Sequence, residues 1–490
     1  MDRKPRNWDE TIAYEIFVQS FADSNGDGIG DLKGVELKLD YLADLGISAI
    51  WLMPINPSPS YHKYDVTDYY GIHPDYGTMQ DLKSLIAAAH NKGIKVIIDL
   101  VVNHCSSQHP WFQVALKNPE SKYRDYFIWK TAEETESENI ATKEISADSD
   151  NINQWGEIEG FDERYFAFFS PAMPDLNYDN PDVRNAIFDV GRFWLSDVGV
   201  DGFRLDAAKH IYPENRYADN LAFWKYFRTE MEKVNPDVFL VGEVWDSAEV
   251  VAPFLKSLHS NFNFDLSEAI INSVKTGKHS GLIDKYQAIN KLYQQASQDF
   301  VDATFLSNHD QNRVRSQVGT IKKTKLAASI LLTLPGTPFI YYGEEIGMQG
   351  KKPDEYIREP FVWDRSDSSK YQTAWIDLKN NQNLVPMDLQ LTRDSSVLNH
   401  YKALINLRNT NAPLRNGQLL EINNPNESIL GYKRVLNQNE IQVFHNLGTT
   451  VVKIPVLKSE ILFSSHHQST ITNSELTIAP QSSVVLKSNF

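Results

Sequence analysis

The chain is poor in cysteine and in positive charge, and it has no long apolar run. Its 490 residues include one cysteine, Cys105, so no disulfide can form within the chain. The formal net charge of -16 argues against a nucleic-acid partner, because lysine and arginine must neutralise the phosphates. No stretch of about 18 or more apolar residues predicts a transmembrane helix, so we expect no membrane partner.

The start of the chain carries no export signal. The residues MDRKPRNW lack the apolar centre of a signal peptide. We therefore expect a soluble protein, cytoplasmic if the chain is complete and secreted or periplasmic if a leader has been removed. We also expect a monomer.

Short apolar runs alternate with amphipathic stretches. The runs predict strands at 13–21, 48–55, 95–102, 199–206, 238–245, 262–266, 303–307 and 338–342. The amphipathic stretches predict helices at 34–45, 79–92, 182–198, 218–234 and 322–334. Strand and helix in alternation predict a parallel sheet with right-handed crossovers. Eight strands predict closure into an α/β fold, the (β/α)8 TIM barrel, with its chemistry on loops at the carboxyl ends of the strands.

Two segments interrupt this alternation. Residues 105–175 are far longer than an ordinary loop and predict an inserted domain after the third strand. Residues 411–490 contain short β-branched and aromatic runs between turn residues, which predict a C-terminal antiparallel β-sandwich domain. Residues 1–104 and 176–410 would then form the barrel.

Three acids lie at or near the carboxyl ends of predicted strands. Asp206, Glu243 and Asp310 follow the fourth, fifth and seventh apolar runs. Desolvating an acid is costly, so three of them at strand ends indicate a site that uses charge. Arg204 and Asp206 share a strand face, and the guanidinium would keep Asp206 ionised, as a nucleophile requires.

Glu243 has apolar neighbours in the sequence. Val241 and Trp245 flank it, and apolar surroundings favour a protonated carboxyl group, as a general acid requires. One ionised and one protonated carboxyl group form the pair that cleaves a glycosidic bond.

Five motifs in order resemble the sequence regions of the α-amylase family, glycoside hydrolase family 13. They are DLVVNH at 99–104, MPDLN at 173–177, GFRLDAAKH at 202–210, GEVW at 242–245 and FLSNHD at 305–310. The resemblance extends over nearly the whole chain, including the inserted and C-terminal segments. The MPDLN motif is most like that of the group intermediate between oligo-1,6-glucosidases and neopullulanases.

The resemblance implies roles for the three acids. Asp206 would be the nucleophile that forms a covalent glycosyl-enzyme, with retention of configuration. Glu243 would protonate the leaving oxygen and then deprotonate the attacking water. Asp310 would grip the hydroxyl groups of the distorted sugar and stabilise the transition state.

The resemblance also implies substrate-binding residues. Arg204 would orient Asp206, and His104 and His309 would donate hydrogen bonds to the same sugar. Tyr64 would be an aromatic platform under it. Lys209 and His210 would contact the sugars of the leaving group, as in enzymes that act on α-1,4-glucans.

The substrate is therefore expected to be an α-glucan or a maltooligosaccharide, cleaved at α-1,4 linkages. An alternative uses the same acids in a glucanotransferase, or in an oligo-1,6-glucosidase or neopullulanase. A third interpretation is a non-catalytic barrel, like the ectodomain of some amino-acid transporter subunits. Such proteins lose the catalytic carboxylates and carry a membrane anchor, whereas this chain keeps all three acids.

The segment Asp23-Ser-Asn-Gly-Asp-Gly-Ile-Gly-Asp31 places oxygen donors at every second position, which suits a tight loop around Ca²⁺. The family resemblance implies Asp23, Asn25, Asp27, the Ile29 carbonyl and Asp31 as ligands. A solvated Asp/Gly turn is the alternative. A second site would use Asn103, the His210 carbonyl and a carboxylate of the inserted segment, for which Asp162 is a guess.

Asp99, Asp175, Glu344, Glu345 and Cys105 are predicted to have no catalytic role. Asp99 is expected to pair with Arg204 or a barrel neighbour, and Glu344 and Glu345 are expected to form hydrogen bonds at the barrel mouth. Cys105 follows His104 directly, and adjacent residues on a strand face opposite ways, so a cysteine nucleophile is not expected.

Overall fold

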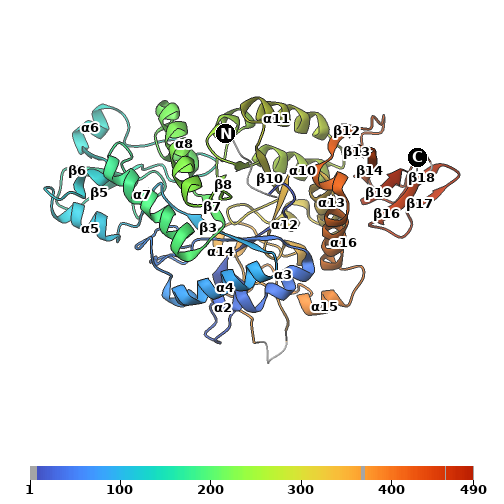
Figure 1. The fold of residues 1–490 in the computed structure, drawn as a ribbon, viewed down its shortest axis with the longest axis horizontal. Coiled ribbons are helices and arrows are strands. Elements are labelled where there is room, and N and C mark those ends of the chain that lie inside the picture. The colour runs from blue at the N-terminus through green and yellow to red at the C-terminus, as the bar shows by residue number, and fades with distance from the viewer. Residues whose placement is uncertain (1–7, 366–369, 458, 489–490) are drawn as a thin grey trace. The chain divides into compact units, whose positions relative to one another are not determined.

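Eight parallel strands form a closed barrel in the computed structural model, which describes residues 8–365, 370–457 and 459–488 (Figure 1). Their order around the barrel is β1-β11-β10-β9-β8-β7-β3-β2. The bounds are β1 Ala13–Ile16, β2 Ala49–Leu52, β3 Lys95–Leu100, β7 Gly202–Leu205, β8 Phe239–Gly242, β9 Ser260–Phe262, β10 Val301–Phe305 and β11 Thr337–Tyr341. The predicted (β/α)8 barrel is confirmed.

Six of the eight strands are shorter than predicted, and one of these lies elsewhere. The run 13–21 divides into β1 and the short helix α1 (Val18–Phe21). The strand predicted at 262–266 is wrong, because β9 ends at Phe262 and helix α10 (Phe264–Thr276) begins two residues later. Asn263 causes this change: its side chain accepts a hydrogen bond from the Leu266 amide and caps the helix.

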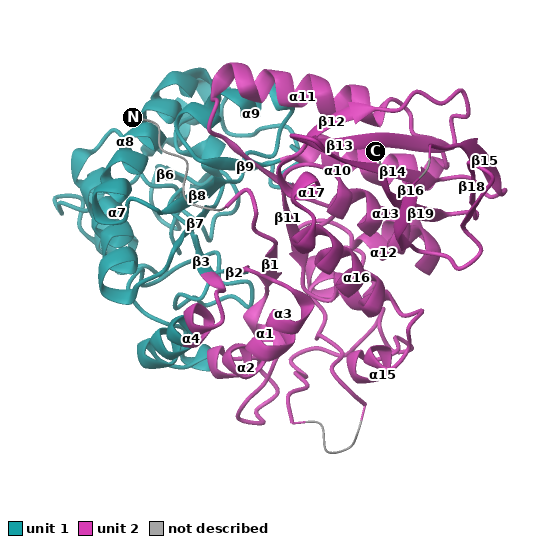
Figure 2. Ribbon diagram, turned by 45° about the vertical axis from the view of Figure 1, so that its right-hand side comes forward, with its two compact units in different colours: residues 1–5, 51–87, 96–262 teal, residues 6–50, 88–95, 263–490 magenta. Residues whose placement is uncertain are grey.

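Two compact units divide the chain (Figure 2). The described residues of the first unit are 51–87 and 96–262. Its helices include α5 (Pro110–Lys117), α6 (Ala132–Ser137), α7 (Pro181–Phe193), α8 (Tyr217–Val234) and α9 (Ala248–Val251), and most of α4 (Met79–Asn91) belongs to it.

The second unit comprises residues 8–50 and 88–95 and the described part of 263–490. Besides α1 and α10 its helices are α2 (Leu32–Leu37), α3 (Leu39–Leu45), α11 (Leu282–Ala296), α12 (Val314–Val318), α13 (Ile321–Thr333), α14 (Asp354–Ile357), α15 (Met387–Leu391), α16 (Val397–Thr410) and α17 (Ala412–Asn416).

Helix α7 shows how the sequence sets an element of the barrel. Asn180 caps its start by accepting from the Asp182 amide, and Pro181 occupies the first turn, where no amide donor is needed. Val183, Ile187 and Val190 recur at helical spacing and are buried. A π-helical turn follows at Trp194–Val198, and the chain then enters β7.

The inserted segment contains a three-stranded antiparallel sheet in the order β4-β6-β5, formed by β4 (Trp129–Thr131), β6 (Glu163–Phe166) and β5 (Trp155–Glu157). Aromatic side chains pack around it: Phe112 stacks on Trp129, with ring centroids 5.8 Å apart, and contacts Tyr165 edge-on. The segment thus has a small core of its own.

The C-terminal region forms two antiparallel sheets, as predicted. The larger has the order β12-β13-β14-β19-β16 and the smaller the order β15-β18-β17. Side chains of both sheets, including Phe444 and Leu486 of the larger and Leu476 and Ile478 of the smaller, share one apolar core. The residue boundaries of the inserted and C-terminal domains stay predictions. The strands are β12 Gln418–Glu421, β13 Ile429–Leu436, β14 Asn439–Asn446, β15 Val452–Pro455, β16 Ser459–Ser464, β17 Thr470–Thr472, β18 Glu475–Ile478 and β19 Ser482–Ser488.

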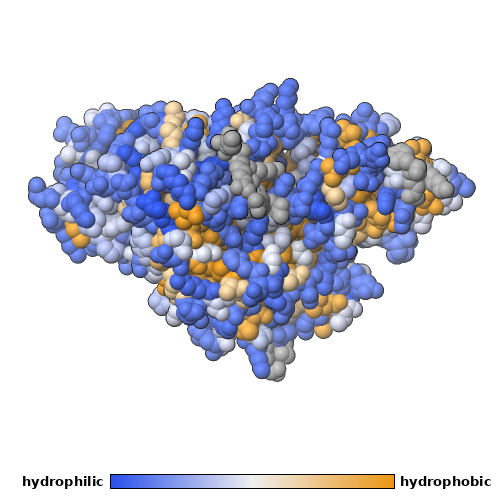
Figure 3. All heavy atoms as spheres, in the orientation of Figure 1, coloured by the Kyte–Doolittle hydropathy of each residue, from blue (hydrophilic) through white to orange (hydrophobic). Residues whose placement is uncertain are grey.

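The face drawn in Figure 3 is mostly hydrophilic, with apolar patches between the hydrophilic residues. Among the described residues, no helix has both the length and the apolar character that a bilayer crossing requires.

Candidate active site

Arg204 is the centre of a charge cluster in the first unit. Its side chain is 1% exposed, and Nη1 donates to Asp206 Oδ1 at 2.6 Å and to Asp99 Oδ1 at 2.9 Å. Nη2 lies 2.7 Å from Glu243 Oε1. One guanidinium therefore binds three carboxyl groups, and the predicted contacts of Arg204 with Asp206 and Asp99 are confirmed.

Strand register explains why these groups meet. Leu205 of β7 pairs with Gly242 of β8, so Asp206 and Glu243 each follow a member of the same residue pair. Asp99 of β3 pairs with Arg204 itself. The carboxyl ends of three neighbouring parallel strands thus deliver the cluster.

Electrostatics keep Arg204 charged. Burial alone would lower its pKa, but the carboxylates of Asp99 and Glu243 outweigh that effect and hold the pKa well above the ordinary value. Besides the apolar neighbours that the sequence predicts for Glu243, the Arg204 cation lies beside its carboxyl group. Removing Arg204 would leave buried carboxylates without their counter-charge, which is strongly destabilising.

Glu243 is fixed by backbone groups as well. The Ala207 amide donates to Glu243 Oε2 at 3.2 Å, and the Ala208 amide donates to the Glu243 carbonyl at 3.0 Å. Ala207 has φ of 47°, in the left-handed region that residues with a Cβ seldom occupy. The strained turn after β7 thus aims an amide at the carboxyl group.

Tyr64 is held by the same cluster. Its hydroxyl donates to Asp99 Oδ2 at 3.0 Å, and its ring centroid lies 5.7 Å from Arg204 Cζ. The ring is partly exposed, and His62 stacks beside it. The hydroxyl is thus anchored, and the role of the ring as a sugar platform stays a prediction.

His104 is buried, and its Nε2 has no hydrogen-bond partner in the described part of the protein. Burial lowers the pKa of His104, although Asp206 acts in the opposite direction, so the imidazole is neutral at pH 7. A buried polar nitrogen without a partner is costly unless a ligand binds it, which suits contact with a sugar hydroxyl.

Lys209 and His210 both contact an acid that was not predicted from the sequence. Asp148 Oδ2 lies 3.0 Å from Lys209 Nζ and 2.7 Å from His210 Nε2. Lys209 Nζ also donates to the Trp245 carbonyl at 2.9 Å. Asp162, the guessed carboxylate of a second calcium site, is exposed, and that site stays a prediction.

In the second unit, Asp310 is paired with two cations. Arg358 Nη2 donates to Asp310 Oδ1 at 2.8 Å, and His309 Nε2 lies 3.0 Å from Oδ2. His309 Nδ1 lies 2.6 Å from Glu15 Oε1, and both of these side chains are buried. Burial would lower the pKa of His309, but Asp310 and Glu15 raise it to about 10, so the ring is an imidazolium at neutral pH.

The loop at 23–31 is closed by its own hydrogen bonds. Asp23 Oδ1 accepts from the Asn25 and Gly26 amides, and Asp31 Oδ1 accepts from the Gly34 amide, which caps α2. In the described ranges, no group of three or more histidine, cysteine, aspartate or glutamate side chains is arranged to hold a metal ion.

The buried acids after β11 are hydrogen-bonded, as predicted. Tyr14 and Tyr41 donate to Glu345 Oε1, each at 2.7 Å, and Tyr401 donates to Glu344 Oε1 at 2.8 Å. Burial raises the pKa of Glu344 to about 8.

Cys105 is buried as a free thiol. Burial raises its pKa well above the ordinary value, which opposes a nucleophilic role.

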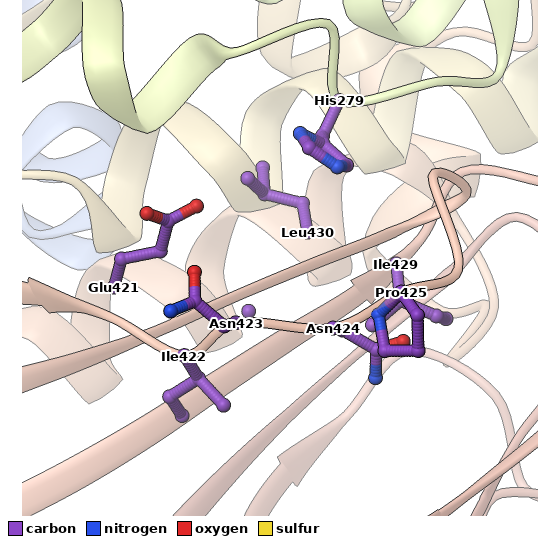
Figure 4. A pocket seen from close by; sticks show the side chains of 9 residues that line it. His279, Glu421, Ile422, Asn423, Asn424, Pro425, Ile429 and Leu430 are labelled. Carbon is purple, nitrogen blue, oxygen red and sulfur yellow. The ribbon is translucent and has the colours of Figure 1, made fainter.

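A separate pocket lies between His279 and residues 421–431 of the C-terminal region, all in the second unit (Figure 4). Its volume is about 280 Å³, and its lining includes Glu421, Asn423 and Asn424 but no tyrosine, tryptophan or phenylalanine. It contains none of the residues predicted to act in catalysis.

Comparisons with known proteins agree with this geometry. A family model described as "Alpha amylase, catalytic domain" matches residues 15–417. The chain is 47% identical over 483 residues to a protein named Alpha-amylase 3 from Dictyoglomus thermophilum, an alignment that covers 97% of this chain and 93% of that protein. It is 36% identical to a 4-alpha-glucanotransferase of Thermotoga maritima, covering 92% of this chain and 100% of that one.

A solved structure, the alpha-amylase from H.orenii, superimposes with a TM-score of 0.89 at 44% identity and covers 98% of this chain and 99% of that one. Family model, relatives and barrel agree: the chain is a glycoside hydrolase that belongs to the α-amylase family, glycoside hydrolase family 13.

Proposed function

We propose that this protein hydrolyses α-1,4 linkages in starch-like glucans and maltooligosaccharides with retention of configuration. The observation that carries the proposal is the shared guanidinium of Arg204, which binds both Asp206 and Glu243. One guanidinium can hold two carboxyl groups in this way only if they lie near one another. That favours the retaining spacing of about 5 to 5.5 Å over the wider spacing of inverting enzymes.

In the first step, Asp206 attacks the anomeric carbon while Glu243 gives its proton to the leaving oxygen, and the glycosidic bond breaks. In the second step, Glu243 takes a proton from water, the water oxygen bonds to the anomeric carbon, and the bond to Asp206 breaks. Arg204 holds the Asp206 carboxyl group in position in this scheme, and His104 Nε2 binds a hydroxyl group of the same sugar.

We assign to Asp310 the stabilisation of positive charge on the distorted sugar. Arg358 and the His309 imidazolium favour its ionised form, which this role requires. Asp310 follows β10, and the carboxyl ends of all strands in a parallel barrel open on one rim.

The product formed first tests the proposal. With maltoheptaose as substrate, proton NMR should show maltooligosaccharides released as the α-anomer before mutarotation. Initial release of the β-anomer would contradict retention. Rates on pullulan and isomaltose, measured beside maltoheptaose, should be lower, because we place the preferred linkage at α-1,4.

Glucanotransfer is the second candidate, and the Thermotoga relative named above supports it. The two reactions share every step up to the glycosyl-enzyme and differ in whether water or a sugar hydroxyl attacks it. If transfer dominates, maltoheptaose will yield chains longer than the substrate at early times, with few new reducing ends. If hydrolysis dominates, reducing ends will appear in step with substrate loss.

We further propose that the loop at 23–31 binds Ca²⁺. The donor set of Asp23, Asn25, Asp27, the Ile29 carbonyl and Asp31 consists of oxygen alone, which suits this hard cation, and a carboxylate oxygen that accepts an amide retains a lone pair. When bound, the ion would tie these residues together and supply no step of the reaction.

Chelation should therefore lower thermal stability. At a Ca²⁺ concentration about 100-fold above the dissociation constant, we expect the melting temperature to rise by about 3–5 °C relative to protein in EDTA. Asp27→Ala should remove most of that rise, whereas Asp44→Ala, an exposed change on α3, should keep it. Identical melting curves with and without Ca²⁺ would contradict the proposal.

A further inference from the structure

Asp148 connects the inserted segment to the loop that follows β7. Its Oδ2 contacts Lys209 Nζ at 3.0 Å and His210 Nε2 at 2.7 Å. Its side chain is 11% exposed, whereas Asp150, two residues on, is exposed. The two contacts hold the pKa of Asp148 far below its ordinary value despite burial, so it is ionised.

Lys209 is anchored to the segment that carries Glu243. Its Nζ donates to the Trp245 carbonyl at 2.9 Å and lies 3.4 Å from Asp246 Oδ2. Trp245 is two residues beyond Glu243. If Glu243 protonates the leaving oxygen, as proposed above, then Lys209 lies on the side of the scissile bond where the leaving sugars bind.

Two aromatic rings of the inserted segment lie beside Lys209 and His210, and together these four side chains form what we call the leaving-side wall. Phe168 packs on His210 with ring centroids 4.1 Å apart, and Phe169 lies 5.4 Å from both His210 and His104. Both phenylalanines are partly exposed. Asp148 thus fixes a cation and an imidazole next to apolar rings, a combination that offers hydrogen bonds and a stacking surface to a sugar.

We propose that Asp148 is a positioning residue that holds Lys209 and His210 for the sugars on the leaving-group side, and thereby sets affinity for long substrates and for sugar acceptors. Its carboxylate limits Lys209, which has several rotatable bonds, to one position, so the entropy of ordering this side chain is lost before substrate binds. The proposal rests on the hydrolytic function proposed above and adds a specificity residue to it.

The test compares a substrate that has sugars on the leaving side with one that has none. Asp148→Ala should lower kcat/KM for maltoheptaose about tenfold, mainly by raising KM, because a charge-assisted hydrogen bond is lost from the binding surface. For α-maltosyl fluoride, whose leaving group is fluoride, kcat/KM should stay within about twofold of the wild-type value. The ratio of transfer to hydrolysis should also fall, because acceptor sugars bind to the same leaving-side wall.

Two variants and a stability measurement serve as controls. Asp150→Ala removes an exposed acid of the same segment and should change neither substrate's rate. Asp148→Glu keeps the charge and should restore part of the maltoheptaose rate. Equal losses on both substrates, together with a lower melting temperature, would show that Asp148 only holds the segment folded and would overturn the proposal, as would wild-type rates on both. If the wild-type protein itself cleaves neither substrate, the proposed function fails instead.

Discussion

Asp206→Asn should abolish turnover on starch and on α-maltosyl fluoride alike, with a loss of about four orders of magnitude or more in kcat. The amide has the shape of the carboxylate but cannot attack the anomeric carbon, so no glycosyl-enzyme forms. The nature of the leaving group does not matter for this loss. The measurement is kcat on both substrates with the same enzyme preparation.

Folding must be verified independently, because Asp206 is also a partner of the buried Arg204. Asp99 and Glu243 still contact the guanidinium in the variant, so the melting temperature should change little. Asp197→Asn, an exposed change before β7, is the matched control and should be fully active. A folded Asp206→Asn enzyme with wild-type rates would refute the assignment of the nucleophile.

Glu243→Gln should lower the rates on starch and on α-maltosyl fluoride in different ways. On starch, the poor leaving group needs a proton, and we expect a loss of about 10³- to 10⁴-fold. On α-maltosyl fluoride, fluoride departs without protonation, so the first step should survive while the second, which needs a base to activate water, becomes slow. The result is a burst of fluoride release, followed by a slow steady state.

The trapped intermediate gives a direct readout. Mass spectrometry after the burst should find one maltosyl group attached to the peptide that contains Asp206. Azide, which attacks without a general base, should restore turnover and yield the α-glycosyl azide. Glu249→Gln, an exposed acid on the following helix, should behave as wild type. Equal losses of the first step on both substrates would contradict the role of Glu243.

The barrel was predictable because its signals are local. Each apolar run and amphipathic stretch carries its own periodicity, and the order of elements then leaves few topologies. The limits of β9 were not predictable from apolarity, since Phe264 and Leu266 continue the apolar run of Phe262 and only the cap at Asn263 separates helix from strand.

In the candidate site, too, some contacts could be predicted from the sequence and others could not. The contact of Arg204 with Asp206 could be predicted, because alternate residues of a strand share one face. The contact with Glu243 could not, because it depends on the register between two strands, which cannot be read from the sequence. Val241 and Trp245 are visible beside Glu243 in the sequence, whereas the Arg204 cation is not.

Two residues that were not predicted differ in whether the sequence could have revealed them. Glu15 was detectable as a charged residue inside an apolar strand, and it proves to bind His309. Asp148 stands in a polar stretch with many acids, and no local pattern distinguishes it from Asp150 or Asp162. Only the folded path of the inserted segment brings it to Lys209.

The charge balance of the Arg204 cluster has a consequence for inhibition. Arg204 contributes one guanidinium to a cluster that contains the carboxyl groups of Asp99, Asp206 and Glu243, so the acids of the cluster outnumber its cation even while Glu243 carries the proton that it donates. A neutral sugar does not compensate that excess, whereas an amine-bearing sugar mimic would. Compounds with a protonated ring nitrogen should consequently compete with glucans by supplying the missing counter-ion, and their potency should decline with rising salt concentration.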